Sequence, residues 1–137
     1  MKDTLVPGIT HTMTYLVDEK RTVPYILPER ADFAAMPHVF ATGFMTAVIE
    51  AACIEALAPH IDDDEVTLGT HVNFSHQAPT VPGSTVTVDV TLEEVNGRAL
   101  LFSITARDEY AVISTGTHQR GLVNRERFLS KLPTKKS

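Results

Sequence analysis

Residues 40–58 read FATGFMTAVIEAACIEALA, and this stretch decides the fold. From Thr42 to Ala58 it consists mainly of residues that favour helices, and Pro59 ends the run. We predict a helix here, the only long one in the chain. Because apolar side chains occupy nearly every side of this helix, most of its surface must be covered by other parts of the protein.

Strand-like segments dominate the rest of the chain. The elements predicted before the helix are a strand at Thr10–Val17, an extended piece at Thr22–Leu27 and a short helix or turn at Glu29–Pro37. After it we predict an acidic loop at Ile61–Glu65, strands at Val66–Gln77, Ser84–Val95, Leu100–Arg107 and Ala111–Val123, and a short helix at Asn124–Leu132. The turn Ala78–Gly83 and the hairpin signal Asn96-Gly97 favour an antiparallel meander of these four strands.

A strongly curved antiparallel sheet of about five strands, wrapped around the single helix, would give the helix the cover it needs. This is the hot-dog fold of the α+β class, with Glu29–Pro37 as a short lid. An α+β sandwich of another kind is the alternative. At 137 residues the chain is expected to be a single domain, residues 1–137. A second subunit would cover what one sheet leaves exposed, so we expect a homodimer.

The composition is that of a globular protein, and a net charge of −5 argues against nucleic acid as a partner. The charge is uneven, because residues 118–137 contain six Lys or Arg and one acidic residue. This basic end suits the phosphates of a nucleotide-like ligand, or it keeps a terminal helix solvated. The chain lacks a signal-peptide pattern and a membrane-spanning apolar run, so we expect a cytoplasmic protein. Cys53 is expected to be a core residue.

Glu50 is an acidic residue within the apolar part of the helix. At about 100° per residue it shares its sector with Thr42 and Thr46, whereas Glu55 lies about 140° away. A buried carboxylate is costly unless it is paired or has a chemical role. The sequence leaves open that Glu50 is a surface residue at a subunit rim.

Alternation in the strand Val66–Gln77 puts His76 on the same face as Val72 and Phe74, and Gly69 on the opposite face. If Val72 and Phe74 face the helix, His76 faces it too. A lone histidine on an apolar face is often only a core residue, but Glu50 offers His76 a partner. The other histidines lack the spacing of metal ligands, so we expect no metal site. Thr42 is a candidate for chemistry, and also a candidate helix N-cap.

Three segments of the chain resemble one known family. They are VFATGFMTAVIEAACIEALAP, LGTHVNFSHQAPTVPGSTVTV and STGTHQRGLV, and the likeness covers roughly Val23–Leu122 with matching order and spacing. Together they resemble the fluoroacetyl-CoA thioesterase family of hot-dog proteins. The resemblance implies an enzyme that hydrolyses a short-chain acyl-CoA to the free acid and coenzyme A, with no cofactor beyond the substrate.

The resemblance also implies a set of site residues. The family's catalytic threonine, glutamate and histidine match Thr42, Glu50 and His76. The residues expected to hold the substrate are Gly69, Arg120, Phe33, Met36 and Phe40. The family's fluoroacetyl-specific enzyme has a second phenylalanine where this chain has Met36, and that aromatic pair is tied to recognition of the fluorinated acyl group. We therefore expect this chain to act on another short acyl-CoA.

Thioester hydrolysis needs a nucleophile, a proton carrier and donors for the oxyanion. His76 suits the proton carrier, because imidazole titrates near neutral pH. Either Glu50 attacks the thioester and forms a mixed anhydride, or Glu50 orients His76 while Thr42 or water attacks. The sequence leaves both mechanisms open. Backbone N–H groups at the helix start, and at Gly69, are candidate oxyanion donors.

Two other functions are compatible with the same fold. One is a non-catalytic acyl-CoA-binding domain, which keeps the pocket without the chemistry. The other is an enoyl or hydroxyacyl thioester hydratase, which typically carries an aspartate-x-x-x-x-histidine arrangement on one element. The sequence shows no such arrangement, and this disfavours the hydratase.

Overall fold

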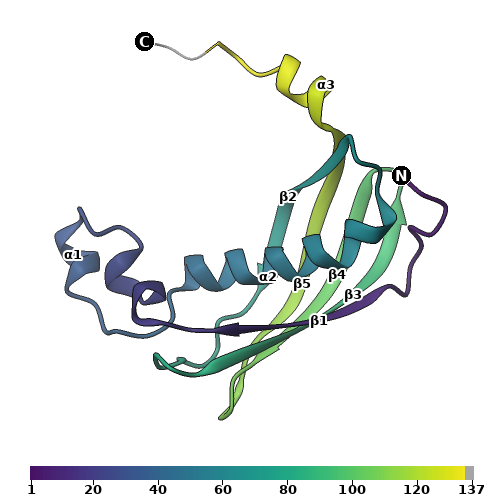
Figure 1. The fold of residues 1–137 in the computed structure, drawn as a ribbon. Helices are drawn as coiled ribbons and strands as arrows, with labels where there is room; N and C mark the ends of the chain where they lie inside the picture. The colour runs from purple at the N-terminus through teal and green to yellow at the C-terminus, as the bar shows by residue number, and fades with distance from the viewer. Residues whose placement is uncertain (135–137) are drawn as a thin grey trace.

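One antiparallel sheet of five strands curls around one long helix in the computed structural model, which describes residues 1–134 (Figure 1). The strands are β1 (Thr10–Leu16), β2 (Glu65–Phe74), β3 (Thr85–Asn96), β4 (Ala99–Arg107) and β5 (Val112–Asn124). Helix α2 (Thr42–Leu57) lies on the concave side of the sheet. The predicted hot-dog architecture is confirmed.

Helix α2 buries one side against the sheet and leaves the other open. Its buried side chains, with those of β3 and β4, form the core: Met45, Val48, Ile49, Ala52, Cys53, Ala56, Leu57, Val86, Val88, Val90, Leu92, Leu100, Phe102 and Ile104. On the open side, Ile54 is 47% exposed. By length and composition Thr42–His60 is apolar enough to cross a membrane, but the core helix of a soluble protein passes the same test. In this structure α2 packs against the sheet with seven of its side chains buried.

The strand order is β1-β3-β4-β5-β2, so the predicted four-strand meander is wrong in one respect. Strands β3, β4 and β5 are sequential neighbours, but β2 pairs with β5 at the sheet edge and not with β3. The segment after β2 contains the predicted turn, closed by a 3.2 Å bond from Ser84 N to Val81 O, but this turn does not pair β2 with β3. Its backbone bonds to other loops instead, through Phe40 N to Thr80 O and Gly83 N to Val17 O.

A β-bulge in β2 changes which residues face the helix. Gly69 pairs with Arg120 and Val72 pairs with His118, and the register shifts between Gly69 and His71. Arg120 and His118 are both buried on the inward face of β5. Gly69 and Val72 therefore share that face, whereas strict alternation had placed them on opposite faces. An extra residue in the strand reverses the alternation beyond it.

The shorter elements refine the prediction. Thr22–Leu27 is not extended, because Pro24 lies in the 3₁₀ turn η2 (Val23–Tyr25), which follows η1 (Glu19–Arg21). The remaining short helices are α1 (Ala31–Ala34) within the predicted lid, η3 (Ala58–His60) and α3 (Arg125–Ser130).

The predicted hairpin is present, with Gly97 and Arg98 between the paired Asn96 and Ala99. Gly97 has φ 61°, which its missing side chain permits.

Candidate active site

Thr42 and His76 meet at the N-terminal end of α2. Thr42 Oγ1 lies 2.7 Å from His76 Nδ1, within hydrogen-bonding distance. Thr42 is the first residue of the helix rather than its N-cap, which is Ala41, so the predicted capping role is wrong. His76 lies two residues beyond the end of β2, and this loop position lets its ring reach the helix. The threonine hydroxyl is thus directed at the imidazole.

A pocket of about 280 Å³ opens beside this pair. Its lining residues are Val23, Val39, Phe40, Thr42, His76, Gln77, Ala78 and Pro79. Phe40 is almost fully buried and stacks on Tyr15, so it forms a rigid part of the wall. Phe33 and Met36 belong to the lid, which lies beyond the start of α2 (Figure 1) and outside this lining.

The His76 ring is partly withdrawn from water. Burial lowers the pKa of His76 below its ordinary value of 6.5, because the charged imidazolium loses hydration. Its Nε2 atom is buried and has no hydrogen-bond partner within residues 1–134. At neutral pH the ring is therefore an uncharged imidazole, the form that accepts a proton.

Glu50 belongs to a second polar cluster, further along α2. Its Oε1 atom accepts a hydrogen bond of 3.2 Å from Arg120, and its side chain is 35% exposed. Gly69 faces the same oxygen so closely that a Cβ atom there would come within 2.4 Å of Oε1. Glu50 thus has a buried cation on one side and a bare stretch of backbone on the other. Glu50 is therefore a half-buried, paired carboxylate. The Glu55 side chain is more exposed, at 52% against 35% for Glu50.

Arg120 is 3% exposed and fully occupied with protein partners. Its Nε donates to Thr67 Oγ1 and one terminal nitrogen donates to Thr67 O, each at 2.8 Å. The other terminal nitrogen reaches Glu50 and lies 3.1 Å from His118 Nε2. A buried guanidinium needs such partners. Arg120 therefore fixes Glu50 and is not free to bind a phosphate.

His118 is a member of this cluster that the sequence pattern did not single out. Its Nδ1 lies 2.8 Å from the carbonyl oxygen of His71, which can only accept a hydrogen bond, so Nδ1 carries the proton. Its Nε2 then accepts from Arg120. Burial is the main cause that lowers the pKa of His118. Its two-residue spacing from Arg120 on one strand is the signal that would have revealed it.

The two clusters are separate within one chain. Thr42 and Glu50 lie eight residues apart on α2, about 12 Å along the helix axis. Within residues 1–134, Glu50 forms an ion pair with Arg120 and lies 3.9 Å from His118 Nε2, and no ion pair or hydrogen bond joins it to His76. The predicted Glu50–His76 contact is therefore not formed here. Helix α2 instead places a hydroxyl–imidazole pair and a paired carboxylate in succession along one side.

Cys53 is a core residue and does not belong to either cluster. Burial raises the pKa of Cys53 to about 12, so this core thiol stays protonated. In the described residues 1–134, no group of three or more His, Cys, Asp or Glu side chains is arranged to hold a metal ion.

Comparison with known proteins links this arrangement to one family. Residues 17–126 match the sequence profile of the family described as fluoroacetyl-CoA-specific thioesterase. The chain is 41% identical over 135 residues to the fluoroacetyl-CoA thioesterase of Streptantibioticus cattleyicolor, spanning 98% of this chain and 97% of that protein.

Solved structures agree with the sequence match. A structure of a fluoroacetyl-CoA thioesterase superposes with a TM-score of 0.91 at 39% identity, covering 96% of this chain and 100% of that one. A phenylalanine-to-alanine variant of the fluoroacetyl-CoA-specific thioesterase, bound to fluoroacetate and CoA, superposes with a TM-score of 0.87 at 41% identity. The match covers 89% of this chain and 98% of that one. A thioesterase superfamily member from Thermus thermophilus superposes with a TM-score of 0.82 at 20% identity, covering 93% of this chain and 90% of that one. This likeness shows the shared fold alone. The chain belongs to the fluoroacetyl-CoA thioesterase family of hot-dog thioester hydrolases.

Proposed function

We propose that this protein hydrolyses a short-chain acyl-CoA to the free acid and coenzyme A, with no cofactor. The observation that carries the proposal is the 2.7 Å contact between Thr42 Oγ1 and His76 Nδ1 at the edge of a pocket. A hydroxyl hydrogen-bonded to an uncharged imidazole is the arrangement that activates a nucleophile for acyl transfer. Membership of a thioesterase family supports the same reaction.

The Thr42–His76 contact favours attack by Thr42, or by a water held in its place, over attack by Glu50. Thr42 Oγ1 attacks the thioester carbonyl carbon as its proton passes to His76. The carbon–sulfur bond then breaks and His76 returns the proton to the departing thiol. Water hydrolyses the threonyl ester by the same proton exchange and releases the acid.

Charge near the carbonyl is stabilised by groups at the start of α2. The first backbone bond of this helix runs from Met45 N to Ala41 O. The N–H groups of Gly43 and Phe44 precede that bond, as orphan donors of a first helical turn do. They are candidate donors to the oxyanion, and the helix dipole acts in the same direction. Glu50, held by Arg120 about 12 Å further along α2, orients the part of the substrate that extends away from the carbonyl.

The acyl group is proposed to be short and not selectively fluorinated. Phe40 closes one wall of the pocket beside Thr42. Met36, which is 49% exposed, stands in the lid where the fluoroacetyl-specific enzyme has a phenylalanine. A flexible thioether packs less selectively against a small fluorinated group than a rigid ring does.

We further propose a cytoplasmic homodimer. The open side of α2 and the free edge of β2 leave Ile54 and Val72 exposed, two apolar side chains on the concave side of the sheet. A second copy covering them would also enclose the substrate between subunits. Cys53 is buried as a free thiol, which suits a reducing compartment.

Release of free thiol from acyl-CoAs of increasing chain length tests the proposed activity. Thr42→Val, His76→Ala and Glu50→Gln should each lower turnover by about 100-fold or more, the scale of a positioned acid–base group. Thr46→Val is the matched control on the same helix, because its hydroxyl only bonds the backbone oxygen of Thr42. Wild-type protein that binds acetyl-CoA without releasing thiol would be a non-catalytic binder.

A further inference from the structure

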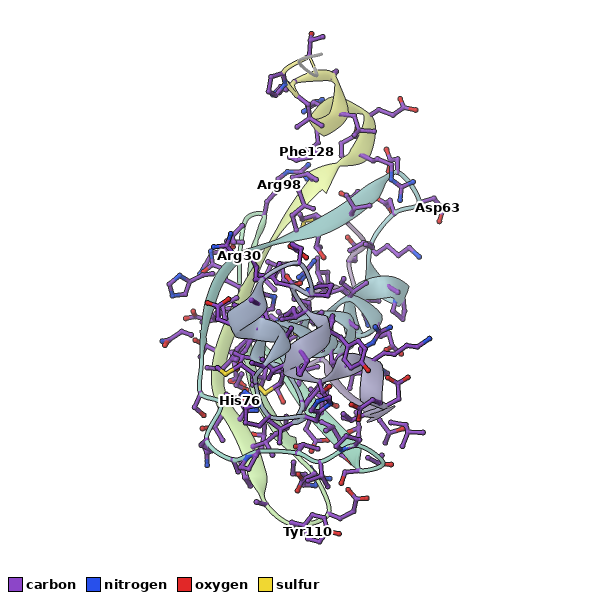
Figure 2. The ribbon with its side chains drawn as sticks, turned by 90° about the vertical axis from the view of Figure 1, so that its left-hand side faces the viewer. Arg30, Asp63, His76, Arg98, Tyr110 and Phe128 are labelled. Carbon is purple, nitrogen blue, oxygen red and sulfur yellow. The ribbon has the colours of Figure 1, made fainter. Side chains whose placement is uncertain are left out.

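A second concave surface lies where β5 passes into α3. It encloses about 200 Å³ and is lined by Arg98, Leu122, Val123, Asn124, Arg127, Phe128 and Lys131. We call this surface the β5–α3 pocket. Figure 2 shows Arg98 and Phe128 together near the end from which α3 projects, well away from His76. The pocket is therefore distinct from the one beside Thr42.

The β5–α3 pocket is basic on an acidic protein. Three of its lining residues are cationic and none is acidic, although the chain carries a net charge of −5. Within residues 1–134, neither Arg127 nor Lys131 forms an ion pair with a carboxylate. Uncompensated cations in a concave surface attract anions, and arginine in particular matches phosphate oxygens.

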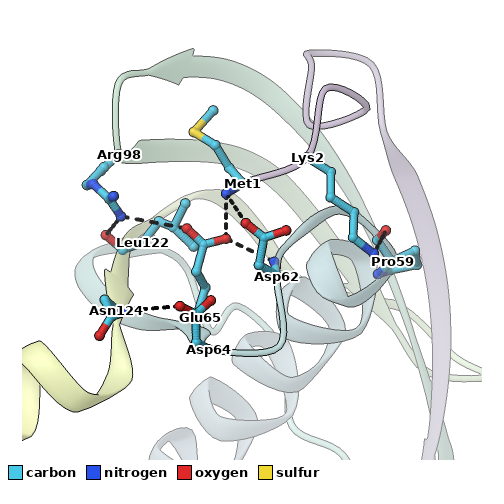
Figure 3. A network of polar contacts seen from close by, with 9 residues as sticks. All are labelled: Met1, Lys2, Pro59, Asp62, Asp64, Glu65, Arg98, Leu122 and Asn124. Carbon is cyan, nitrogen blue, oxygen red and sulfur yellow. Dashed lines mark hydrogen bonds and ion pairs between the residues drawn. The ribbon is translucent and has the colours of Figure 1, made fainter.

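Arg98 is held at the rim of this pocket by the fold. It lies in the β3–β4 turn, where its side chain donates to Leu122 O at 3.3 Å and lies 3.8 Å from Glu65 Oε2 (Figure 3). Glu65 is shared with the amino group of Met1, 2.6 Å away, so it compensates Arg98 only in part. The Arg98 side chain is 60% exposed and remains accessible to a ligand.

The pocket also offers an aromatic surface. Phe128 lines it and is 36% exposed, and Leu122 supplies a buried apolar floor. An exposed ring beside cations is the combination that binds nucleotides, because the ring stacks on the base while the cations hold the phosphates. Inorganic phosphate alone would not require the ring.

The position of the pocket relates it to the candidate active site. Leu122 follows Arg120 by two residues on the inward face of β5, about 7 Å along the strand. Arg120 itself is buried and bound to Thr67, Glu50 and His118, so it has no free donor for a phosphate. Beyond this end of the strand, the β5–α3 pocket supplies the accessible cations Arg98, Arg127 and Lys131.

We propose that the β5–α3 pocket binds the phosphorylated adenosine end of coenzyme A. Phe128 stacks on the adenine, and Arg98, Arg127 and Lys131 hold the phosphates. The pantetheine arm then extends from the pocket toward Glu50, whose side chain is 35% exposed. This assignment rests on the proposed thioesterase function, because that function supplies the ligand.

Adenosine 3′,5′-bisphosphate is the direct probe, since it carries the base and phosphates without the thioester. Calorimetry should show binding to the wild-type protein, and Arg127→Ala/Lys131→Ala should weaken it by about tenfold or more, as loss of charge-assisted hydrogen bonds does. Arg125→Ala is the matched control, because Arg125 belongs to α3 but does not line the pocket. No binding to wild type, unchanged binding to the double variant, or equal affinity for inorganic phosphate would overturn the assignment.

Kinetics with two thioesters provides a second test. The double variant should raise KM for acetyl-CoA by about tenfold with little change in kcat, because only uniform binding is lost. It should leave kcat/KM for S-acetylpantetheine unchanged, since that substrate lacks the nucleotide. An equal loss for both substrates would overturn the assignment. If neither thioester is hydrolysed by wild type, the proposed function fails, while the bisphosphate measurement still decides whether the pocket binds a nucleotide.

Discussion

Gly69 leaves room for the carboxylate of Glu50: a Cβ atom at position 69 would lie 2.4 Å from Glu50 Oε1. Gly69→Ala must therefore displace a carboxylate that Arg120 also holds. We expect turnover to fall by about 10- to 100-fold, because misplacement by about 1 Å is costly to a positioned group. The thermal midpoint should change little, since the Glu50 side chain is 35% exposed and able to move.

Thiol-release assays and thermal melts of Gly69→Ala check this expectation. Gly121→Ala is a suitable control, because a Cβ there meets only the Thr70 methyl group, at 3.2 Å. Full activity in Gly69→Ala would show that the close approach to Glu50 has no role in the reaction.

His118 should act as a positioning residue for Arg120. Its Nε2 accepts from Arg120 while its Nδ1 donates to His71 O. His118→Leu leaves a buried N–H of Arg120 without that acceptor, and we expect a loss of about 1–3 kcal/mol in unfolding free energy, measured by urea denaturation. It should also lower kcat, because Glu50 is held through Arg120.

A conservative variant separates positioning from simple packing. Glutamine has both a donor and an acceptor, so His118→Gln should recover most of the activity and stability lost in His118→Leu. If the two variants were equally impaired, the hydrogen bonds of His118 would not matter, and only the shape of its ring would.

The helix and most strands could be predicted from local sequence, because α2 is rich in helix formers and β3 alternates with a period of two. The bulge between Gly69 and His71 could not, since nothing in the local pattern marks an inserted residue. Pairing of β2 with β5 likewise depends on contacts distant in sequence. The family resemblance grouped Thr42 with His76, and the structure brings these two into contact. The predicted partner of Glu50, His76, is wrong, because its partner Arg120 lies 70 residues away in sequence.

The activity should have an acid limb set by His76. Burial lowers the pKa of this histidine below 6.5, and the uncharged ring is the form that accepts the proton of Thr42. The limb of kcat/KM against pH should therefore have its midpoint below 6.5, with activity constant above it. A pH profile with a non-ionising acyl-CoA measures this. A midpoint at or above 6.5 would argue against His76 as the base.

Stability should also depend on pH through two histidines, the half-buried His76 and the buried His118. The pKa values of His76 and His118 are lowered in the folded state. At a pH between the folded and the unfolded pKa, the unfolded chain therefore binds more protons than the folded protein. Their contribution to stability is thus fully present above the unfolded pKa of about 6.5. It is lost as the pH falls from that value through the lower folded pKa. Urea denaturation between pH 5 and 8 measures the slope, and His118→Gln should reduce it. An unchanged slope in that variant would exclude His118 as a contributor.

Met36→Phe should shift acyl selectivity toward fluoroacetyl-CoA. Met36 is 49% exposed and follows α1, whose Phe33 lies three residues earlier, so a ring at position 36 can pair with Phe33. We expect the ratio of kcat/KM for fluoroacetyl-CoA over acetyl-CoA to rise by about tenfold, the scale of one added aromatic interaction in the transition state. Met36→Leu, which replaces the thioether with a similar aliphatic volume, is the control and should leave the ratio unchanged. The same ratio in all three proteins would mean that position 36 does not contact the acyl group.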